Sequence, residues 1–237
     1  MLEVREVSKH FGGLMALRKL SLHLERAEGV WGLIGPNGSG KTTLLNVICG
    51  LYRPDQGTVL FQGRRIDQLS PHQIARLGIG RTFQVAKVFR RLTVLENMLV
   101  PGFTNRETES PRQLREQALE LLDFMQLSNL KDEQAGNLSG GQQKLLDFAR
   151  VLMLKPKLLL LDEPFAGVHP LLKERMINRI TLLHQQGIRF LVVSHDLPSV
   201  LELCSHLVVL SSGEKIAEGE PEMVRKEERV VEAYLGV

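Results

Sequence analysis

The chain carries a glycine-rich segment at residues 35–43, which reads Gly35-Pro36-Asn37-Gly38-Ser39-Gly40-Lys41-Thr42-Thr43. The segment fits G-x-x-x-x-G-K-[ST], the pattern of a phosphate-binding loop, or P-loop. Glycines allow successive backbone N–H groups to turn toward one anion, while Lys41 supplies a positive charge for the phosphates and Thr42 a hydroxyl for Mg²⁺. We therefore predict that all nine residues contact a bound nucleotide. The alternative is a glycine-rich turn that fits the pattern by chance.

The segments on both sides of this loop favour the phosphate-binding interpretation. Residues 30–34 are typical of a buried strand, and residues 41–49 are typical of a helix. A loop between them delivers an anion to a helix N-terminus, where the helix dipole favours negative charge. Strand, loop and helix therefore agree on one site.

The composition is typical of a globular protein with one large domain. Of the 237 residues, 43% are hydrophobic and 24% charged, and the net charge of +3 is too small to indicate a nucleic-acid partner. We expect no signal peptide, because the N-terminal residues include acids, and no apolar run approaches the roughly 18 residues of a membrane helix. Cys49 and Cys204 lie in apolar helical patterns and are predicted to be buried thiols, which suits a reducing cytoplasm.

The order of the other elements predicts an α/β fold with an inserted helical block. Alternating apolar and polar residues predict strands at 2–10, 20–24 and 58–61. Strands and helices alternate again from residue 158, ending in one charged helix over 220–235, and this alternation predicts a mostly parallel sheet with helices on both faces. The predicted division is a single domain over 1–237, a core formed by 1–86 and 155–237, and a helical subdomain at 87–154.

Two acidic residues follow the aliphatic run at residues 158–161. Asp162 and Glu163 stand at the carboxyl end of this predicted strand, where parallel sheets bind ligands. Asp162 is a candidate ligand for Mg²⁺, and Glu163 is a candidate general base for an attacking water. The alternative is a strand that ends in two solvated acids.

A second candidate phosphate cradle lies at Leu138-Ser139-Gly140-Gly141-Gln142. A serine and two glycines precede a predicted helix over 142–152, so backbone N–H groups again meet a helix N-terminus. One nucleotide does not need two such cradles in one subunit. We predict that Ser139, Gly140, Gly141 and Gln142 contact a nucleotide held by another subunit, the alternative being a simple helix cap at Ser139.

The P-loop, the 138–142 motif and the acidic strand end, in this order, resemble the ATP-binding subunit of an ABC transporter over essentially the whole chain. The resemblance implies a P-loop NTPase fold with an antiparallel β part near the N-terminus. It places Gln84 at the Q-loop, as a Mg²⁺ ligand and catalytic residue, and His195 at the catalytic switch histidine. It implies that Phe11 stacks on adenine. Residues 164–169 correspond to the D-loop, where His169 replaces the family's common aspartate.

The resemblance also implies cofactors and partners. ATP and Mg²⁺ are the expected cofactors, and two ATP-binding subunits are expected to sandwich two ATP molecules. Transmembrane permease subunits are the other expected partners, so that contact with the membrane is indirect. The implied location is peripheral, on the cytoplasmic face of the inner membrane.

Particular segments narrow the subfamily. Residues 80–84 (Gly-Arg-Thr-Phe-Gln), 89–97 and 232–236 resemble importers of branched-chain amino acids and their urea-importer relatives. Residues 164–168 look more like the lipopolysaccharide-export ATPase. We give more weight to 80–84, because in the family this segment meets the membrane partner. A soluble ABC protein without a transport role is the other alternative, whereas a nucleotide kinase would lack the 138–142 motif.

Overall fold

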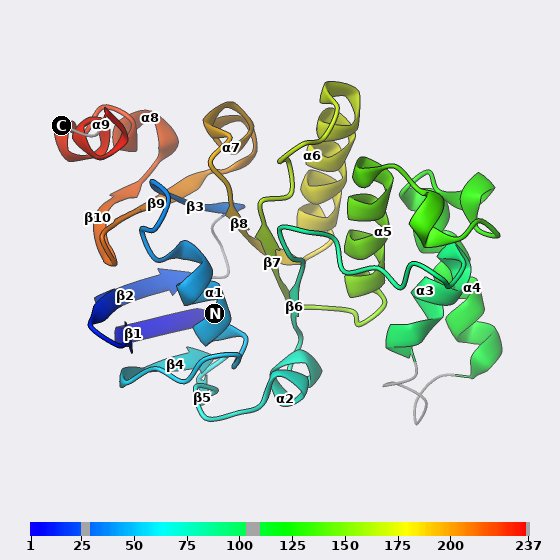
Figure 1. Cartoon of the computed structure of the whole chain (residues 1–237), viewed down its shortest axis with the longest axis horizontal. Helices are drawn as coiled ribbons and strands as arrows, with labels where there is room; N and C mark the ends of the chain where they lie inside the picture. The colour runs from blue at the N-terminus through cyan, green and yellow to red at the C-terminus, as the bar shows by residue number, and fades with distance from the viewer. Residues whose placement is uncertain (25–28, 103–109, 236–237) are drawn as a thin grey trace.

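A six-stranded sheet forms the centre of the computed structural model, which describes residues 1–24, 29–102 and 110–235 (Figure 1). The strand order is β10-β9-β3-β8-β7-β6, and all neighbours are parallel except β10 and β9. The prediction of a mostly parallel sheet is confirmed. The strands span Trp31–Ile34 (β3), Ile79–Arg81 (β6), Leu158–Asp162 (β7), Arg189–Val193 (β8), His206–Ser211 (β9) and Glu214–Gly219 (β10).

A second, antiparallel sheet is built mainly from the N-terminal residues, as predicted. Its strands, in the order β2-β1-β4-β5, are Leu14–Leu24, Leu2–Phe11, Gln56–Phe61 and Arg64–Arg65. Leu2 pairs with Leu24 on one side and with Phe61 on the other, and all three side chains are buried. Strand β2 is longer than the predicted 20–24 segment because its first half pairs with β1 up to Phe11.

Helix α1 (Lys41–Ile48) lies between the two sheets (Figure 1). Its residues Leu44, Leu45 and Ile48 are fully buried in one apolar cluster with residues of both sheets, including Leu2 and Leu33. Burial on both sides fixes α1 firmly, and the P-loop that precedes it is fixed with it. Helix α2 (Pro71–Arg76) begins after its N-cap, Ser70.

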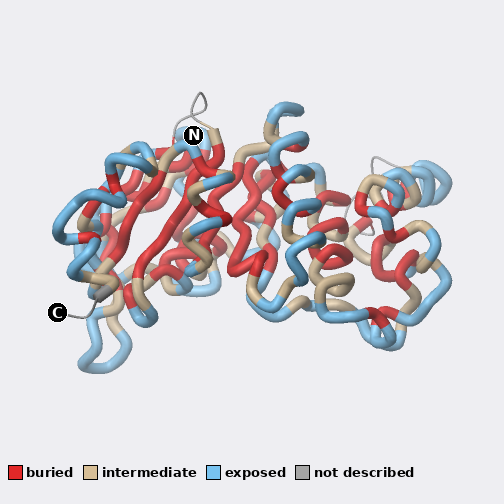
Figure 2. The backbone as a smooth tube through the Cα atoms, turned by 90° about the horizontal axis from the view of Figure 1, so that it is seen from above, coloured by how far each residue is buried: buried red, intermediate tan, exposed pale blue. Residues whose placement is uncertain are grey.

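Helices cover the opposite face of the central sheet and extend away from it (Figures 1 and 2). They are α3 (Val94–Gly102), α4 (Pro111–Phe124), α5 (Gly140–Leu152), α6 (Pro170–Gln185) and α7 (Leu197–Leu203), with short 3-10 turns at Ser128–Leu130 and Ala135–Asn137. Between residues 87 and 154, the described part of the chain forms no strand, and only a single bridge joins Thr93 to Gln134.

The C-terminal region differs from its prediction. It forms two helices, α8 (Pro221–Val224) and α9 (Glu228–Leu235), instead of one helix over 220–235. Val224 and Val230 are both buried. At 3.6 residues per turn, positions six apart lie about 120° apart around a straight helix, so a break lets both valines reach the core. Residues 225–229, which lie between these valines, are all charged and have no apolar side chain to bury.

Two predictions from composition can be compared with the structure. Cys49 and Cys204 are free and buried, and burial raises the pKa of their thiols to about 11 and about 12. The predicted buried thiols are therefore confirmed. Among the described residues, no helix is both long and apolar enough to cross a bilayer.

Candidate nucleotide-binding site

An open pocket of about 930 Å³ lies where strands β3, β7, β8 and β9 end. It brings together nearly all of the predicted nucleotide and catalytic residues. They are Phe11, the P-loop residues 35–43, Gln84, Asp162, Glu163 and His195. The segment Ser139–Gln142 does not line this pocket. The pocket has the size and the polar groups of a small-molecule site.

The P-loop backbone requires glycine at Gly35 and Gly40, whose φ angles are 146° and 103°. A Cβ atom at Gly40 would lie 2.6 Å from the carbonyl oxygen of Ala16. Lys41 folds back into the loop and donates hydrogen bonds to the carbonyls of Gly35 and Pro36, at 2.7 and 2.8 Å. Burial lowers the pKa of Lys41, although Glu163 and Asp162 oppose the shift. The loop therefore holds a desolvated cation, which strengthens its attraction for phosphate.

Asp162 is half of a buried ion pair that the sequence did not reveal. Arg81, at the end of β6, donates from Nη2 to Asp162 Oδ2 at 2.8 Å, and both side chains are about 5% exposed. Arg81 also donates to Asn46 Oδ1 on α1 at 2.6 Å. Arg81 belongs to the segment expected to face a membrane partner, but its side chain turns inward and joins β6, β7 and α1. The signal in the sequence for this ion pair is Arg81 itself, a cation at the end of β6, the strand that pairs with β7.

Glu163 has an unusual backbone and a well-defined set of contacts. Its φ of 50° is left-handed, which is uncommon for a residue with a side chain and costs roughly 1–2 kcal/mol. Its Oε2 lies 2.8 Å from His195 Nδ1 and accepts hydrogen bonds from Ser194 Oγ at 3.2 Å and His195 N–H at 3.3 Å. The two catalytic candidates are thus in direct contact. Strained residues held by their surroundings are typical of functional sites.

We expect His195→Ala to slow ATP hydrolysis at least about tenfold, or roughly 1.4 kcal/mol. The change removes both the candidate contact to the γ-phosphate and the ring beside Glu163. Steady-state phosphate release under saturating ATP provides the measurement. His72→Ala, an exposed histidine on α2, is the matched control. A wild-type rate for His195→Ala would exclude a role in hydrolysis.

Phe11 lies at the end of β1, on the rim of the pocket. Its ring is 41% exposed and packs edge-to-face on Tyr52, with 5.1 Å between ring centroids. Lys9 Nζ lies over the ring at 5.6 Å from its centroid, and the partly exposed side chain lines the pocket. An aromatic face of this kind can stack on a nucleotide base.

The 138–142 motif forms the N-terminus of α5 and lies outside the pocket. Ser139 Oγ accepts from the Gln142 N–H at 3.3 Å, and Gln142 Oε1 accepts from the Ser139 N–H at 2.9 Å, so the two form a capping box. A Cβ at Gly141 would lie 2.5 Å from Leu172, whereas one at Gly140 would meet nothing within 4 Å. Gly141 thus packs closely against Leu172 of α6, while Gly140 faces open space.

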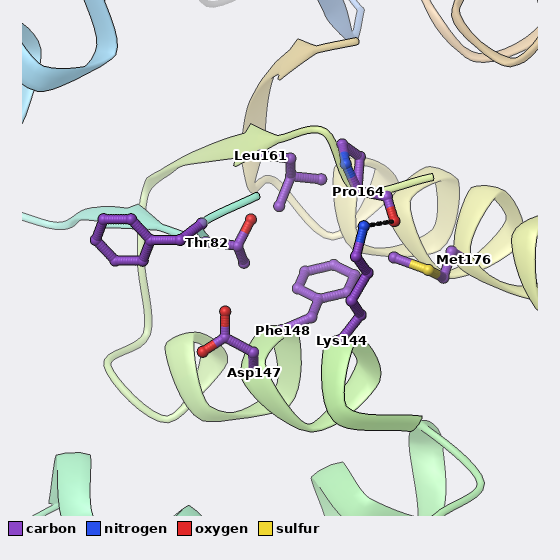
Figure 3. A pocket seen from close by; sticks show the side chains of 8 residues that line it. Thr82, Lys144, Asp147, Phe148, Leu161, Pro164 and Met176 are labelled. Carbon is purple, nitrogen blue, oxygen red and sulfur yellow. Dashed lines mark hydrogen bonds between the residues drawn. The ribbon is translucent and has the colours of Figure 1, made fainter. Parts of the chain in front are cut away.

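A small cavity separates α5 from the strands β6 and β7 (Figure 3). Lys144 of α5 donates to the backbone carbonyls of Glu163 and Ala166, at 2.8 and 2.7 Å. This contact connects the helix that follows the 138–142 motif to the candidate general base. Across the cavity, the buried Thr82 Oγ1 and Asp147 Oδ2 have no hydrogen-bond partner, and burial raises the pKa of Asp147. Nothing in the local sequence around Lys144 indicated this connection.

His169 is the N-cap of α6, and its ring takes part in the cap. Nδ1 accepts from the Leu171 N–H at a long distance of 3.4 Å. A carboxylate would accept more strongly and would also complement the helix dipole. We expect His169→Asp to stabilise the folded chain by about 0.5 kcal/mol, measured by urea unfolding. Equal midpoints for the two proteins would contradict the cap argument.

Comparisons with known proteins agree with this geometry. The family model "ABC transporter" matches residues 17–166, and the model "Branched-chain amino acid ATP-binding cassette transporter" matches residues 214–237. A probable branched-chain amino acid transport ATP-binding protein of Archaeoglobus fulgidus is 42% identical and aligns with 100% of this chain and 95% of its own length. The lipopolysaccharide export ATP-binding protein of Haemophilus influenzae is 38% identical, over 100% of this chain and 97% of its own length.

Solved structures agree as well. The ADP conformation of an ABC transporter cassette superimposes with a TM-score of 0.89 at 38% identity and covers 100% of this chain and 99% of the other. A dimeric bacterial ABC transporter cassette gives a TM-score of 0.85 at 28% identity, with 93% and 99% covered. The chain belongs to the family of ABC transporter ATP-binding subunits.

Proposed function

We propose that this chain hydrolyses ATP to drive an importer of branched-chain amino acids or related small polar solutes. The observation that carries the proposal is the single pocket that joins the P-loop to Gln84, Asp162, Glu163 and His195. The match of residues 214–237 to the branched-chain model supports this solute class. In the proposed reaction Glu163 accepts a proton from the attacking water, and His195 orients Glu163 and contacts the γ-phosphate.

The pocket fits Mg²⁺ as well as ATP. Thr42, Gln84 and Asp162 supply a hydroxyl, an amide and a carboxylate, the oxygen ligands that Mg²⁺ prefers. Asp162 Oδ2 is held by Arg81, so the other carboxylate oxygen is the one to face the ion. A bound Mg²⁺ would neutralise charge on the phosphates. Arg81 holds the Asp162 carboxylate in the orientation needed for that role.

Two kinds of partner follow from the surface outside the pocket. Ser139 and Gly140 are exposed and lie away from the chain's own P-loop, which supports pairing with a second ATP-binding subunit. Phe83, Val85 and Phe89 are exposed apolar residues on both sides of Gln84, and they suit a permease contact on the helical subdomain side. We place the helical subdomain at 87–154, and the complex on the cytoplasmic face of the membrane.

Uptake of radiolabelled leucine in cells that lack the chromosomal gene tests the solute class. Wild-type protein should restore uptake, and Glu163→Gln should not. Unrestored leucine uptake in cells that contain active wild-type protein would reject leucine as the solute. Defective lipopolysaccharide export in the same cells would favour the second candidate, an export ATPase, which the 38% identity to the Haemophilus protein supports.

A further inference from the structure

The side chain of Lys144 reaches from helix α5 to the segment that follows β7 (Figure 3). Its ammonium donates hydrogen bonds to the backbone carbonyls of Glu163 and Ala166, at 2.8 and 2.7 Å. A third and longer bond of 3.5 Å, the dashed line in Figure 3, runs to the carbonyl of Pro164. An ammonium has three N–H donors, so these three carbonyls match its capacity. Lys144 therefore links α5 to one short turn of the chain.

The turn at residues 163–168 lies between β7 and α6 and belongs to neither a strand nor a helix. Within it, the Ala166 N–H donates to the Glu163 carbonyl at 3.3 Å, and the Val168 N–H donates to the Phe165 carbonyl at 3.2 Å. Both distances lie at the long end of the normal range. The two short bonds from the ammonium are charge-assisted, and such bonds are roughly twice as strong as neutral ones. They therefore contribute more to the shape of the turn than its own backbone bonds do.

Glu163 is the first residue of this turn, and its backbone is held on both sides by other elements. Its N–H donates to the Val193 carbonyl at the end of β8, and its carbonyl accepts from Lys144 of α5. Between these two anchors its φ is 50°. A strained backbone persists only where the surroundings hold it. Since the side chain leaves the backbone at Cα, relaxation of φ would move the carboxylate away from its 2.8 Å contact with His195.

Lys144 does not line the nucleotide pocket, which already contains the P-loop cation Lys41. Lys144 lies instead along the small cavity between α5 and the strands β6 and β7. Burial lowers the pKa of its ammonium, and the negative charge of Glu163 opposes that shift. Any effect of Lys144 on the reaction must therefore pass through the turn that begins at Glu163.

We propose that Lys144 is a positioning residue for ATP hydrolysis, whose ammonium holds the carbonyls of Glu163 and Ala166 and so aims the Glu163 carboxylate at the attacking water. Lys144 touches neither ATP nor the reacting atoms, and it takes no part in the proton transfer. The proposal rests on the proposed function, since it requires Glu163 to be the general base of an ATPase.

Lys144→Met tests the proposal, because methionine keeps an unbranched stem and removes the ammonium. Misplacing a reacting group by about 1 Å can cost on the order of 100-fold in rate. We expect kcat to fall about 10- to 100-fold, while the Kd of the isolated subunit for ATP stays at the wild-type value. Lys144→Arg keeps a cation with several N–H donors and should retain at least about a third of the wild-type kcat. Lys226→Met, an exposed lysine between α8 and α9, is the control and should leave both values unchanged.

The Glu163→Gln background separates a positioning role from a general structural one. If Lys144 acts through the carboxylate of Glu163, adding Lys144→Met to Glu163→Gln should change the residual single-turnover rate by less than about twofold. Light scattering of this double variant with Mg²⁺ and saturating ATP should give the same mass as Glu163→Gln alone. A further tenfold fall in rate, or a smaller mass, would overturn the proposal, because Lys144 would then act through the 138–142 motif or through the fold.

The outcomes also separate this proposal from the proposed function. If the wild-type protein hydrolyses ATP and Lys144→Met matches its kcat, the role of Lys144 is rejected and the ATPase function stands. Equal loss of kcat in Lys144→Met and Lys144→Arg, or weaker ATP binding by Lys144→Met, would also reject that role. If the wild-type protein neither binds nor hydrolyses ATP, the proposed function itself fails. Thermal unfolding of each variant verifies that the rates belong to folded protein.

Discussion

The Glu163→Gln variant is expected to lose about 10²–10⁴ of the hydrolysis rate, or roughly 3–5.5 kcal/mol of transition-state stabilisation, while keeping its affinity for ATP. An amide has nearly the shape of the carboxylate but cannot accept a proton from water. The hydrogen bonds and the ion pair of the Glu163 side chain run to Ser194 and His195, and it acts on the P-loop through its charge, at Lys41. Binding and chemistry should therefore separate cleanly at this position.

Single-turnover hydrolysis and equilibrium binding of a fluorescent ATP analogue give the two quantities. Glu174→Gln on α6 removes the same charge outside the pocket and should behave as wild type. Turnover near the wild-type rate in Glu163→Gln would mean that another group accepts the proton. Equal loss of binding and hydrolysis would show that the change had disturbed the loop.

The second large effect is expected for Ser139→Arg, which places a bulky cation on the exposed N-terminus of α5. Since Ser139 does not line the chain's own pocket, ATP binding to the isolated subunit should be nearly unchanged. Hydrolysis should fall at least about 100-fold, the size of effect seen when one preorganised donor to a transition state is removed. We expect this contrast because the sequence predicts that the two cradles serve different nucleotides.

The chain offers a close control in Ser110→Arg. Ser110 is also a serine N-cap with a capping box, formed with Gln113 at the start of α4. Loss of either cap should destabilise the chain by about 1 kcal/mol, but only Ser139→Arg should stop hydrolysis. If Ser139→Arg reduced ATP binding and hydrolysis to the same extent, the motif would act within one subunit.

The sequence predicted the parts of the site that are formed by residues adjacent in the chain. The P-loop is one continuous segment, and its glycines, lysine and threonines are adjacent, so the pattern alone located it. Asp162 and Glu163 follow one strand, and a strand end is visible in the order of apolar and acidic residues. The pocket in the structure brings these segments together as expected.

The missed residues act across long separations in sequence. Arg81 pairs with Asp162, Lys144 bonds to the carbonyl of Glu163, and Tyr234 lines the nucleotide pocket from the last helix. None of the three belongs to a local pattern, because each contact depends on the register of strands or on helix packing. The break between α8 and α9, which brings Tyr234 to the pocket, depends likewise on which valines the core accepts.

The left-handed backbone of Glu163 is another feature that could not be predicted from local sequence. Local preferences disfavour a positive φ at a glutamate, and the conformation is held by the Glu163 N–H, which donates to the Val193 carbonyl at 2.8 Å. That contact joins the ends of β7 and β8, which are neighbours in the sheet but distant in the chain. Tertiary structure thus sets the position of the candidate base.

We expect a second subunit to complete the ATP site. The molecular mass of the Glu163→Gln protein in solution tests this expectation most directly. Light scattering should give the mass of two chains with Mg²⁺ and saturating ATP, and the mass of one chain with Mg²⁺ and ADP. Adding Ser139→Arg to Glu163→Gln should restore the single-chain mass with ATP. A single-chain mass for Glu163→Gln at ATP concentrations that saturate its pocket would contradict the account.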